Sequence, residues 1–438
     1  QGGDNMKRRK IAITIALMGT TFVSYAATEA DVDQAFNPYK NGAPNIQGLT
    51  PGTVINKTNL AQFEKYIDKG NAFAIKNGWY EIKVGKHSNF APHASYIAET
   101  KKNLNKTKLG PKLGDIEGYA GGLPFPEEPK TNDPRAGEKL AWNFKYNFGA
   151  GDGSKYDPFF YQFRNMNDGK LERVIKFSYN VQKHKFRVRQ EPIGEMLPNP
   201  SELFRSFYIK VSEPQDVKDT QLLIQRYLDD NKLDDAYLYL GFQRRVRRLA
   251  TGQTTDPFLG TDLMIEDFEG YNARVSDTNW KYKETTTVLL PMYNHNELPL
   301  AEEGKESDGY KYVASTGQGN CFVDITWQPR KVYVVEGSPV KDNHPVSKRV
   351  FYIDAQTFTI PQINIYDRKG ELWKIWTIGL SHPDQHLPVN KGTGVPLFDS
   401  FSMVDVQSKH CTVGLIRGEV KQPDPRLFTV QQMRGGTN

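Results

Sequence analysis

The sequence has 438 residues, of which 25% are charged, 38% are hydrophobic and 12% are aromatic. This composition excludes an intrinsically disordered chain, because it supplies enough apolar surface to form a core. The formal net charge is +6, but four basic residues, Lys7–Lys10, lie together near the amino terminus. Without residues 1–26 the charge falls to about +3, so we expect no binding to nucleic acid.

Residues 6–26 have the pattern of a secretory signal peptide. The basic run is followed by a mostly apolar stretch, Ile11–Val23, and then by the small residues Ser24 and Ala26. This arrangement directs export and cleavage, and the apolar stretch is shorter than the roughly 20 residues that span a membrane. We therefore expect flanking sequence at residues 1–5, cleavage near Ala26, and a mature protein that is soluble outside the cytoplasm.

The chain has two cysteines, Cys321 and Cys411. In an oxidising compartment such a pair can form one disulfide, which would stabilise the fold by about 4–5 kcal/mol in the chain-entropy model. Two unpaired buried thiols are the alternative, because the sequence does not report the distance between them.

We expect residues 27–438 to form a single domain, because a chain of this length can bury one large core. The first part of this domain is turn-rich. A helical segment follows at about 56–77, in which Leu60, Phe63 and Ile67 recur at the spacing of one helical face.

Beyond Trp79 the chain reads as a series of strands. Apolar residues alternate with polar ones at 175–179, 185–189 and 207–211, and this period of two places the apolar side chains on one face of a sheet. Short connections such as Asp367–Gly370 indicate antiparallel neighbours, so we predict a wide antiparallel meander with little helix. Further short strands are predicted at 222–227, 236–240, 285–290, 332–335, 349–353, 362–366 and 372–376.

A sheet that is apolar on one face must be covered on that face. A helix and long loops such as 110–133, 252–270 and 294–309 could cover it incompletely, and a curved sheet would then enclose an apolar cavity. Residues that line such a cavity and residues that fill a core have the same pattern in the sequence. The lining candidates are Phe177, Tyr179, Phe186, Val188, Phe207, Ile209, Trp280, Tyr333 and Phe351.

No catalytic motif is complete in the sequence. There is no Gly-x-Ser-x-Gly nucleophile elbow and no Walker motif, and Gly149–Ser154 lacks the last glycine of a phosphate-binding pattern. Asp229–Asp235 resembles a calcium loop, but leucine occupies one ligand position, so we expect a solvated turn. His382 and His386 have Pro383 where the metalloprotease pattern needs glutamate. We therefore expect no metal, no cofactor and no enzymatic activity.

Val246 is surrounded by four arginines, Arg244, Arg245, Arg247 and Arg248. They form either a solvated edge that pairs with acids such as Glu266 or Asp267, or a rim that contacts a partner. In the second case the guanidinium groups would bind a lipid headgroup or an acidic surface through two hydrogen bonds each.

Several longer stretches resemble one family. They are 118–126 (GYAGGLPFP), 133–143 (DPRAGEKLAWN), 243–270 (QRRVRRLATGQTTDPFLGTDLMIEDFEG) and 349–376 (RVFYIDAQTFTIPQINIYDRKGELWKIW), with Phe428-Thr429 near the end. Together with the signal peptide, these stretches resemble the domain-of-unknown-function 1329 family of Gram-negative bacteria over nearly the whole mature chain. The middle block is also similar to outer-membrane lipoprotein-sorting proteins.

The resemblance implies a mainly β (α+β) fold like that of the periplasmic lipoprotein carriers LolA and LolB. In that fold a strongly curved antiparallel half-barrel wraps around a few covering helices and encloses a pocket for acyl chains. The resemblance further implies a periplasmic location and two partners, a resistance-nodulation-division-type exporter and an outer-membrane β-barrel. It carries over no catalytic residue, and the segment 294–320 is longer and more polar than the family pattern.

These observations favour one function over two alternatives. The favoured function is a soluble periplasmic carrier that shields a lipid-like hydrophobic ligand inside the half-barrel. The first alternative is an interaction module whose core is filled and which holds no ligand. The second is an envelope hydrolase that uses a pair of carboxylates.

Overall fold

The computed structural model describes residues 26–250 and 253–435. The expected signal peptide, residues 6–26, lies outside the described residues except for Ala26. Within the described chain, no helix combines the length and the apolar character needed to cross a membrane.

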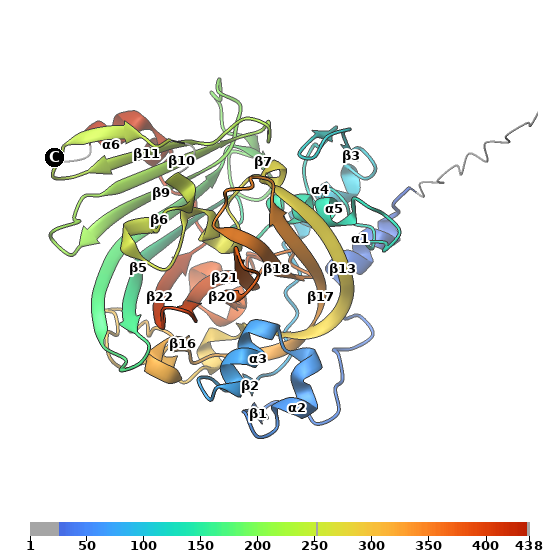
Figure 1. Cartoon of the computed structure of the whole chain (residues 1–438). Coiled ribbons are helices and arrows are strands. Elements are labelled where there is room, and N and C mark those ends of the chain that lie inside the picture. The colour runs from blue at the N-terminus through green and yellow to red at the C-terminus, as the bar shows by residue number, and fades with distance from the viewer. Residues whose placement is uncertain (1–25, 251–252, 436–438) are drawn as a thin grey trace, which may run out of the picture.

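One large sheet dominates the fold (Figure 1). Its sixteen described strands are β1 (Val54–Ile55), β2 (Ile82–Val84), β5 (Gly153–Asn165), β6 (Leu171–Lys183), β9 (Leu203–Glu213), β10 (Gln221–Tyr227), β11 (Asp235–Leu240), β12 (Arg245–Arg248), β13 (Thr278–Leu290), β14 (Met292–Tyr293), β17 (Thr326–Pro339), β18 (Val346–Asp354), β19 (Gln362–Asp367), β20 (Leu372–Ser381), β21 (Leu397–Asp405) and β22 (His410–Glu419). Their order is β1-β2-β17-β18-β19-β20-β21-β22-β5-β6-β9-β10-β11-β12, with β13 on β17 and β14 on β20. Neighbours are antiparallel except for the pairs β2–β17 and β14–β20.

The smaller elements lie around this sheet. Three short pairs are β3 (Lys108–Leu109) with β4 (Ile116–Glu117), β7 (Lys185–Arg187) with β8 (Gly194–Glu195), and β15 (Ser315–Thr316) with β16 (Phe322–Val323). The helices are α1 (Glu29–Phe36), α2 (Leu60–Phe63), α3 (Lys69–Lys76), α4 (Ala94–Lys102), α5 (Ala136–Lys145) and α6 (Val430–Gly435).

The sheet is strongly curved and its two ends do not meet. In Figure 1, β13 and β17 form one wall, β5 and β6 form the opposite wall, and β18–β22 connect them. Among the described strands, β13 pairs only with β17 and β12 pairs only with β11. The sheet is therefore an open half-barrel, which confirms the predicted fold class.

The concave face of the half-barrel is apolar. Alternate residues of β5, β6 and β9 point inward, and Phe159, Phe177 and Phe207 are buried there. Helix α5 lies against β13. Residues 258–277, which we call the strap, cross the concave face in three short 3-10 turns and bury Leu263 and Phe268 in the same core.

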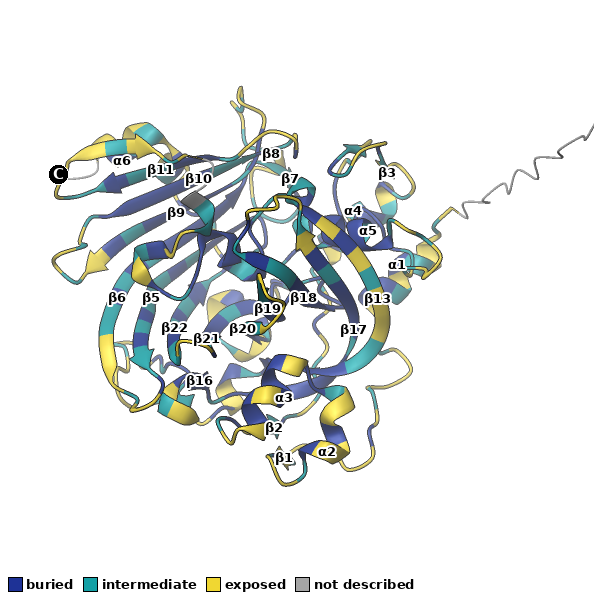
Figure 2. Cartoon of the chain, in the orientation of Figure 1, coloured by how far each residue is buried: buried dark blue, intermediate teal, exposed yellow. Residues whose placement is uncertain are grey.

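The convex face is covered as well. Helices α2 and α3 and the β15–β16 pair form a second core with Trp327, Ile375 and Val413. The carboxyl-terminal helix α6 covers β9–β11, where Met433 packs with Tyr208. As Figure 2 shows, the strands are largely buried, and exposed residues gather on β13, on α2 and in the loops.

Cys321 and Cys411 form a disulfide, with an S–S distance of 2.04 Å and a Cα–Cα distance of 5.6 Å. Cys321 directly precedes β16, and Cys411 lies in β22. The bond therefore joins a covering element of the convex face to the main sheet, and the predicted pairing is confirmed.

The structure differs from the prediction in its helices and in three strands. Helices α4 and α5, and strands β5, β21 and β22, lie in regions where the sequence predicted other structure or none. The predicted helix at 56–77 is interrupted, because Ile67 is extended and Asp68 begins a new helix by accepting the Asn71 N–H at 2.9 Å. The predicted strand at 185–189 forms β7, which pairs with β8 rather than with β6.

Removal of the disulfide should destabilise the protein. The two cysteines are 90 residues apart, and opening a loop of this length costs up to about 4–5 kcal/mol in the chain-entropy model. Urea unfolding of Cys321→Ser/Cys411→Ser should show this loss, and reduced wild type should unfold at the same urea concentration as the double variant. An unchanged unfolding midpoint in both would contradict the prediction.

Candidate ligand cavity

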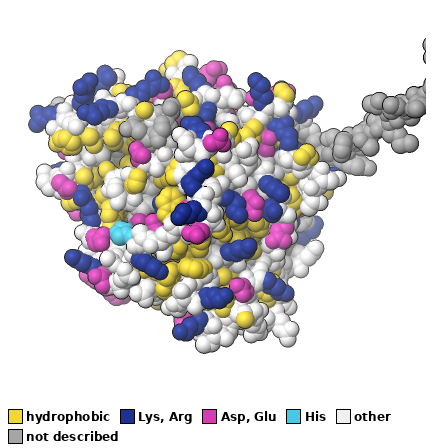
Figure 3. Space-filling view, in the orientation of Figure 1, with side chains coloured by type: hydrophobic (Ala, Val, Ile, Leu, Met, Phe, Trp, Pro, Cys, Tyr) yellow, Lys and Arg dark blue, Asp and Glu magenta, His cyan; other side chains and the backbone are white. Residues whose placement is uncertain are grey.

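A cavity of about 100 Å³ lies inside the half-barrel, between the sheet, helix α5 and the strap. Its apolar walls come from distant parts of the chain and include Phe144, Phe204, Trp280, Ile378 and Phe398. Hydrophobic side chains are visible in the middle of the face shown in Figure 3, between basic and acidic ones. Charged side chains such as Lys183 and Glu269 also line the cavity, so its walls combine apolar surface with charge.

The charge inside the cavity comes from a row of three cations. Lys183, Arg205 and Arg226 line the cavity, and they lie directly opposite one another on β6, β9 and β10. We call these three residues the cationic row. Like charges in directly opposite positions of a sheet repel each other, so the row needs anions nearby.

Two members of the cationic row have such anions. Arg205 binds Glu269 of the strap through two contacts of 2.6 Å. Arg226 binds Asp234 through contacts of 3.1 and 2.7 Å. Both arrangements are bidentate, which is the geometry in which a guanidinium group binds a carboxylate most strongly.

Lys183 differs from the other two. Its side chain is buried, and its Nζ donates a hydrogen bond to the Asn147 carbonyl at 3.0 Å. Burial lowers the pKa of the Lys183 ammonium to about 8, although the charge of Asp152 offsets part of this effect. Within the described chain, no carboxylate forms an ion pair with Lys183, so its charge is balanced only at a distance.

A fourth cation, Lys145 of α5, closes the same cavity. Its Nζ lies 3.2 Å from Asp230 Oδ1, and Asp230 also accepts the Ser276 N–H at 2.9 Å. The segment Asp229–Asp235 was expected to be a solvated turn. That expectation is wrong for Asp230 and Asp234, because both carboxylates bind cations that line the cavity.

A second, smaller cavity of about 20 Å³ adjoins the first. Glu269 and Phe398 line both. Three of the residues proposed from the sequence, Phe177, Tyr179 and Ile209, line this smaller cavity. Phe268 of the strap lines it too, so the strap fills part of the hollow that was predicted on the concave face.

The other proposed lining residues lie elsewhere in the core. Trp280 lines the larger cavity, and Phe351 packs against Trp280 with ring centres 5.2 Å apart. The ring centres of Phe207 and Phe268 are 5.9 Å apart. Tyr333 binds Glu128 through its hydroxyl group at 3.1 Å, and Phe186 and Val188 lie at or beside β7, off the main sheet.

The strap is attached to the sheet through its acidic side chains. The pair of Glu266 and Arg349 is nearly fully buried, and removing one partner of such a buried pair costs about 3–5 kcal/mol. The pairs made by Asp262 and Glu269 are partly exposed. The pairs are Asp262 with His410 at 2.8 Å, Glu266 with Arg349 at 3.1 Å, and Glu269 with Arg205 at 2.6 Å.

The four arginines around Val246 lie on β12 and on its hairpin with β11. Arg248 binds Asp235, whereas Glu266 and Asp267 contact Arg349. Glu266 and Asp267 are therefore not the partners of these arginines, but Arg248 does pair with an acid, Asp235, at an exposed edge. At the tip of the hairpin, 77% of the Phe242 side chain is exposed, so the hairpin presents an aromatic ring among positive charges.

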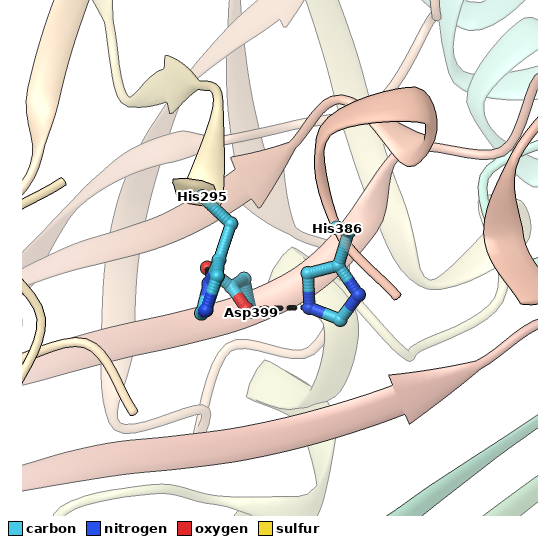
Figure 4. A group of neighbouring side chains, drawn as sticks. All are labelled: His295, His386 and Asp399. Carbon is cyan, nitrogen blue, oxygen red and sulfur yellow. Dashed lines mark hydrogen bonds and ion pairs between the residues drawn. The ribbon is translucent and has the colours of Figure 1, made fainter. Parts of the chain in front are cut away.

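A second polar group lies on the convex side, beside a bulge in β21. As Figure 4 shows, His295 and His386 point towards Asp399, with contacts of 2.8 Å to His295 Nδ1 and 3.1 Å to His386 Nε2. His295 Nε2 also faces the Lys311 carbonyl at 3.0 Å. Both nitrogens of His295 thus face acceptors, and although burial lowers its pKa, Asp399 more than offsets this and leaves the pKa raised.

The atoms of His295, His386 and Asp399 that could bind a metal lie within 4.8 Å of one another. The surrounding hydrogen bonds oppose that use. Asn390 Nδ2 donates to His386 Nδ1 at 2.9 Å, and the amide is held in this orientation because its Oδ1 accepts the Val420 N–H. His386 therefore carries its proton on Nε2, which is then not free to bind a metal. The group fits a hydrogen-bonded anchor for the polar segment 294–320.

The cationic row is not among the sites predicted from the sequence, although the sequence contains a signal for it. On β6 the inward-facing positions run Phe177, Tyr179 and Val181, and Lys183 continues that series. Arg205 and Arg226 continue the inward series of β9 and β10 in the same way. A cation that continues an apolar series is the feature that could have identified the site.

These features define a half-barrel protein in which a strap covers the concave face and a small, partly charged cavity remains. The family model described as "Protein of unknown function (DUF1329)" matches residues 54–434, and the chain belongs to this family. The resemblance seen in the sequence is confirmed.

One relative and three solved structures are similar to this chain. An uncharacterized protein of Pseudomonas aeruginosa is 26% identical over 75% of this chain, and the chain spans 65% of the length of that relative. Similar structures include a putative outer membrane lipoprotein-sorting protein domain from Vibrio parahaemolyticus and a DUF1329 family protein from Desulfovibrio piger. Each has a TM-score of 0.46 and 16% identity, covering 69% of this chain and 100% of the other. A LolA superfamily protein from Nitrosomonas europaea has a TM-score of 0.35 and 12% identity, covering 64% and 91%.

The attachment of the strap should weaken at alkaline pH. The hydrogen bond to Asp262 raises the pKa of His410 to about 9, above the usual value of about 6.5. Its stabilising effect is therefore complete below about pH 6.5 and is lost as the pH rises through about 9.

The variant His410→Gln tests this dependence. It should unfold a few degrees below wild type at about pH 6, and the difference should vanish above about pH 9. Thermal unfolding followed by circular dichroism measures both. A difference that stays constant across this range would contradict the assignment of the charge to His410.

Proposed function

We propose that this protein is a periplasmic carrier or binding protein for a lipid-like hydrophobic molecule. The observation that supports this most is the cavity inside the half-barrel, which is lined by apolar side chains beside charged ones and is bordered by the strap. Burial of an acyl chain there would contribute about 0.8 kcal/mol per methylene before ordering costs. Family membership supports the same function, because the resemblance to lipoprotein-sorting proteins implies an acyl-chain pocket.

The ligand would have to displace part of the strap. The two cavities measure about 100 and 20 Å³, whereas pockets for drug-sized ligands measure about 300–1,000 Å³. Phe268 of the strap packs among the aromatic residues of the concave face, with its ring centre 5.9 Å from that of Phe207 and 5.3 Å from that of Phe258, another residue of the strap. In this proposal Phe268 moves out when an acyl chain moves in.

The variant Phe268→Ala should enlarge the hollow. Stability should fall by about 3–5 kcal/mol, and the neutral dye N-phenylnaphthylamine should bind more tightly than to wild type, as measured by fluorescence titration. Phe322→Ala is the matched control, because Phe322 is equally buried in the core of the convex face. Equal dye binding by the two variants would contradict a role for Phe268 in filling a ligand site.

Protein purified from its own periplasm should carry a bound hydrophobic molecule. Native mass spectrometry should show an added mass that disappears after solvent extraction, and the extract should contain the molecule. An empty protein that also fails to bind N-phenylnaphthylamine would reject the carrier function. In that case the protein would be better described as an interaction module.

The interaction module is the second candidate, and the filled concave face favours it. Aromatic side chains leave only about 20 Å³ between β5, β6 and the strap. The surface that would dock is the β11–β12 hairpin, where exposed arginines surround Phe242. We propose this hairpin as the contact with an acidic surface on an envelope partner such as an exporter of the resistance-nodulation-division type or an outer-membrane β-barrel.

A further inference from the structure

The cationic row is the most unusual arrangement in the interior. Three positively charged side chains, Lys183, Arg205 and Arg226, occupy directly opposite positions on neighbouring strands. Directly opposite residues on one face have Cβ atoms about 5 Å apart. Such a row is stable only where anions balance it, because unpaired charges in an apolar interior cost several kcal/mol each.

The protein supplies anions for two of the three positions. Glu269 binds Arg205, and Asp234 binds Arg226. Lys183 has no such partner among the described residues, although only 6% of it is exposed. Among the described residues, its ammonium donates one hydrogen bond, to the Asn147 carbonyl, and lies 5.7 Å from the centre of the Phe148 ring, so no carboxylate neutralises it by direct contact.

The Lys183 ammonium, which has no direct counter-ion among the described residues, lies on the cavity wall. Lys183 lines the cavity of about 100 Å³, together with Arg205 and apolar side chains such as Phe204 and Phe398. The volume is enough for about three water molecules, or for a small anionic group. The cavity therefore offers an anion a buried cation on one side and apolar contact on the other.

The smaller cavity indicates where an alkyl chain attached to such an anion would lie. Phe398 and Glu269 separate the two cavities, and beyond them lie the rings of Phe159, Phe177 and Phe401. A headgroup at Lys183 would thus have its alkyl chain directed along the aromatic concave face, where Phe268 now lies. The charged and apolar halves of one amphiphile match these two regions.

We propose that Lys183 recognises the anionic headgroup of an acyl amphiphile, a carboxylate or a phosphate monoester, whose chain lies along the aromatic face. This deepens the proposed carrier function and rests on it. Arg205 lies beside the headgroup, and its partner Glu269 belongs to the strap. An anion at Lys183 therefore competes with Glu269 for Arg205, which couples headgroup binding to release of the strap.

The test measures displacement of bound N-phenylnaphthylamine, which is neutral and reports only on the apolar hollow. The competitors are palmitate, hexadecyl phosphate, neutral hexadecanol and inorganic phosphate. In wild type, palmitate and hexadecyl phosphate should compete about tenfold more tightly than hexadecanol, since a hydrogen bond to a charged group contributes this much. Inorganic phosphate alone should not displace the dye.

The variant Lys183→Met should remove this preference, so that palmitate and hexadecyl phosphate compete no more tightly than hexadecanol. It should also fold, because replacing a buried charge by an apolar side chain of similar size is neutral or stabilising when the charge has no partner. Lys176→Met is the matched control: Lys176 lies on the same strand but on its outer face, near Glu213, and the preference should persist in this variant.

The preference should also disappear at alkaline pH. Burial sets the pKa of Lys183 at about 8, with Asp152 and Glu269 raising it and Arg205 and Arg187 lowering it. The ammonium is the form that binds an anion, so the preference for palmitate should be present at about pH 7 and lost at about pH 9.5.

Four results would overturn the inference. Equal competition by palmitate and hexadecanol in wild type would overturn the headgroup assignment and leave the carrier function intact. A preference for palmitate that survives in Lys183→Met would have the same meaning. If inorganic phosphate blocks palmitate binding as strongly as hexadecyl phosphate does, the site binds free anions and not a headgroup. If the dye and every amphiphile fail to bind, the carrier function fails first and the headgroup assignment fails with it.

Discussion

An open, strongly curved sheet has a concave surface that the sheet itself cannot cover, and the attachment of the strap solves this problem. Three acids of the strap reach three different parts of the sheet: Asp262 binds β22, Glu266 binds β18 and Glu269 binds β9. Ion pairs of this kind contribute little net free energy when buried, but they specify one arrangement because an unpaired partner is costly. The position of the strap, and with it the shape of both cavities, follows from these three contacts.

The same attachment links the cover to the charge inside. Glu269 is at once a residue of the strap and the counter-ion of Arg205, so the strap cannot leave without exposing a cation of the row. If apolar contacts alone held the strap in place, its opening would not depend on the charge of the ligand. In this protein the ion pair that neutralises Arg205 is also a contact that attaches the strap.

The sequence predicted those features that depend on local periodicity. The inward positions of Phe177, Tyr179 and Ile209 follow from a period of two, and the sheet class follows from many such runs. Lys183 continues the same period, but its neighbours Arg205 and Arg226 become visible only when the register between strands is known. The contact between Arg205 and Glu269 spans 64 residues, and no local pattern reports it.

Helix α5 was not predicted because its apolar face is set by packing against β13, where Gly137 meets the backbone of Trp280. The helix boundary at Asp68 was also missed, because a capping residue inside an apolar series looks like a polar position on the same helix. The disulfide was one of two open possibilities until the distance between the cysteines was known.

The open edge of the half-barrel has a consequence for behaviour in a crowded compartment. Strand β13 is thirteen residues long and lies at an edge, so its outer backbone groups could template pairing with another chain. Lys281, Lys283 and Glu284 project from this edge into solvent. Charges at such positions oppose strand addition. The sheet can therefore keep an open edge without pairing with a strand of another chain.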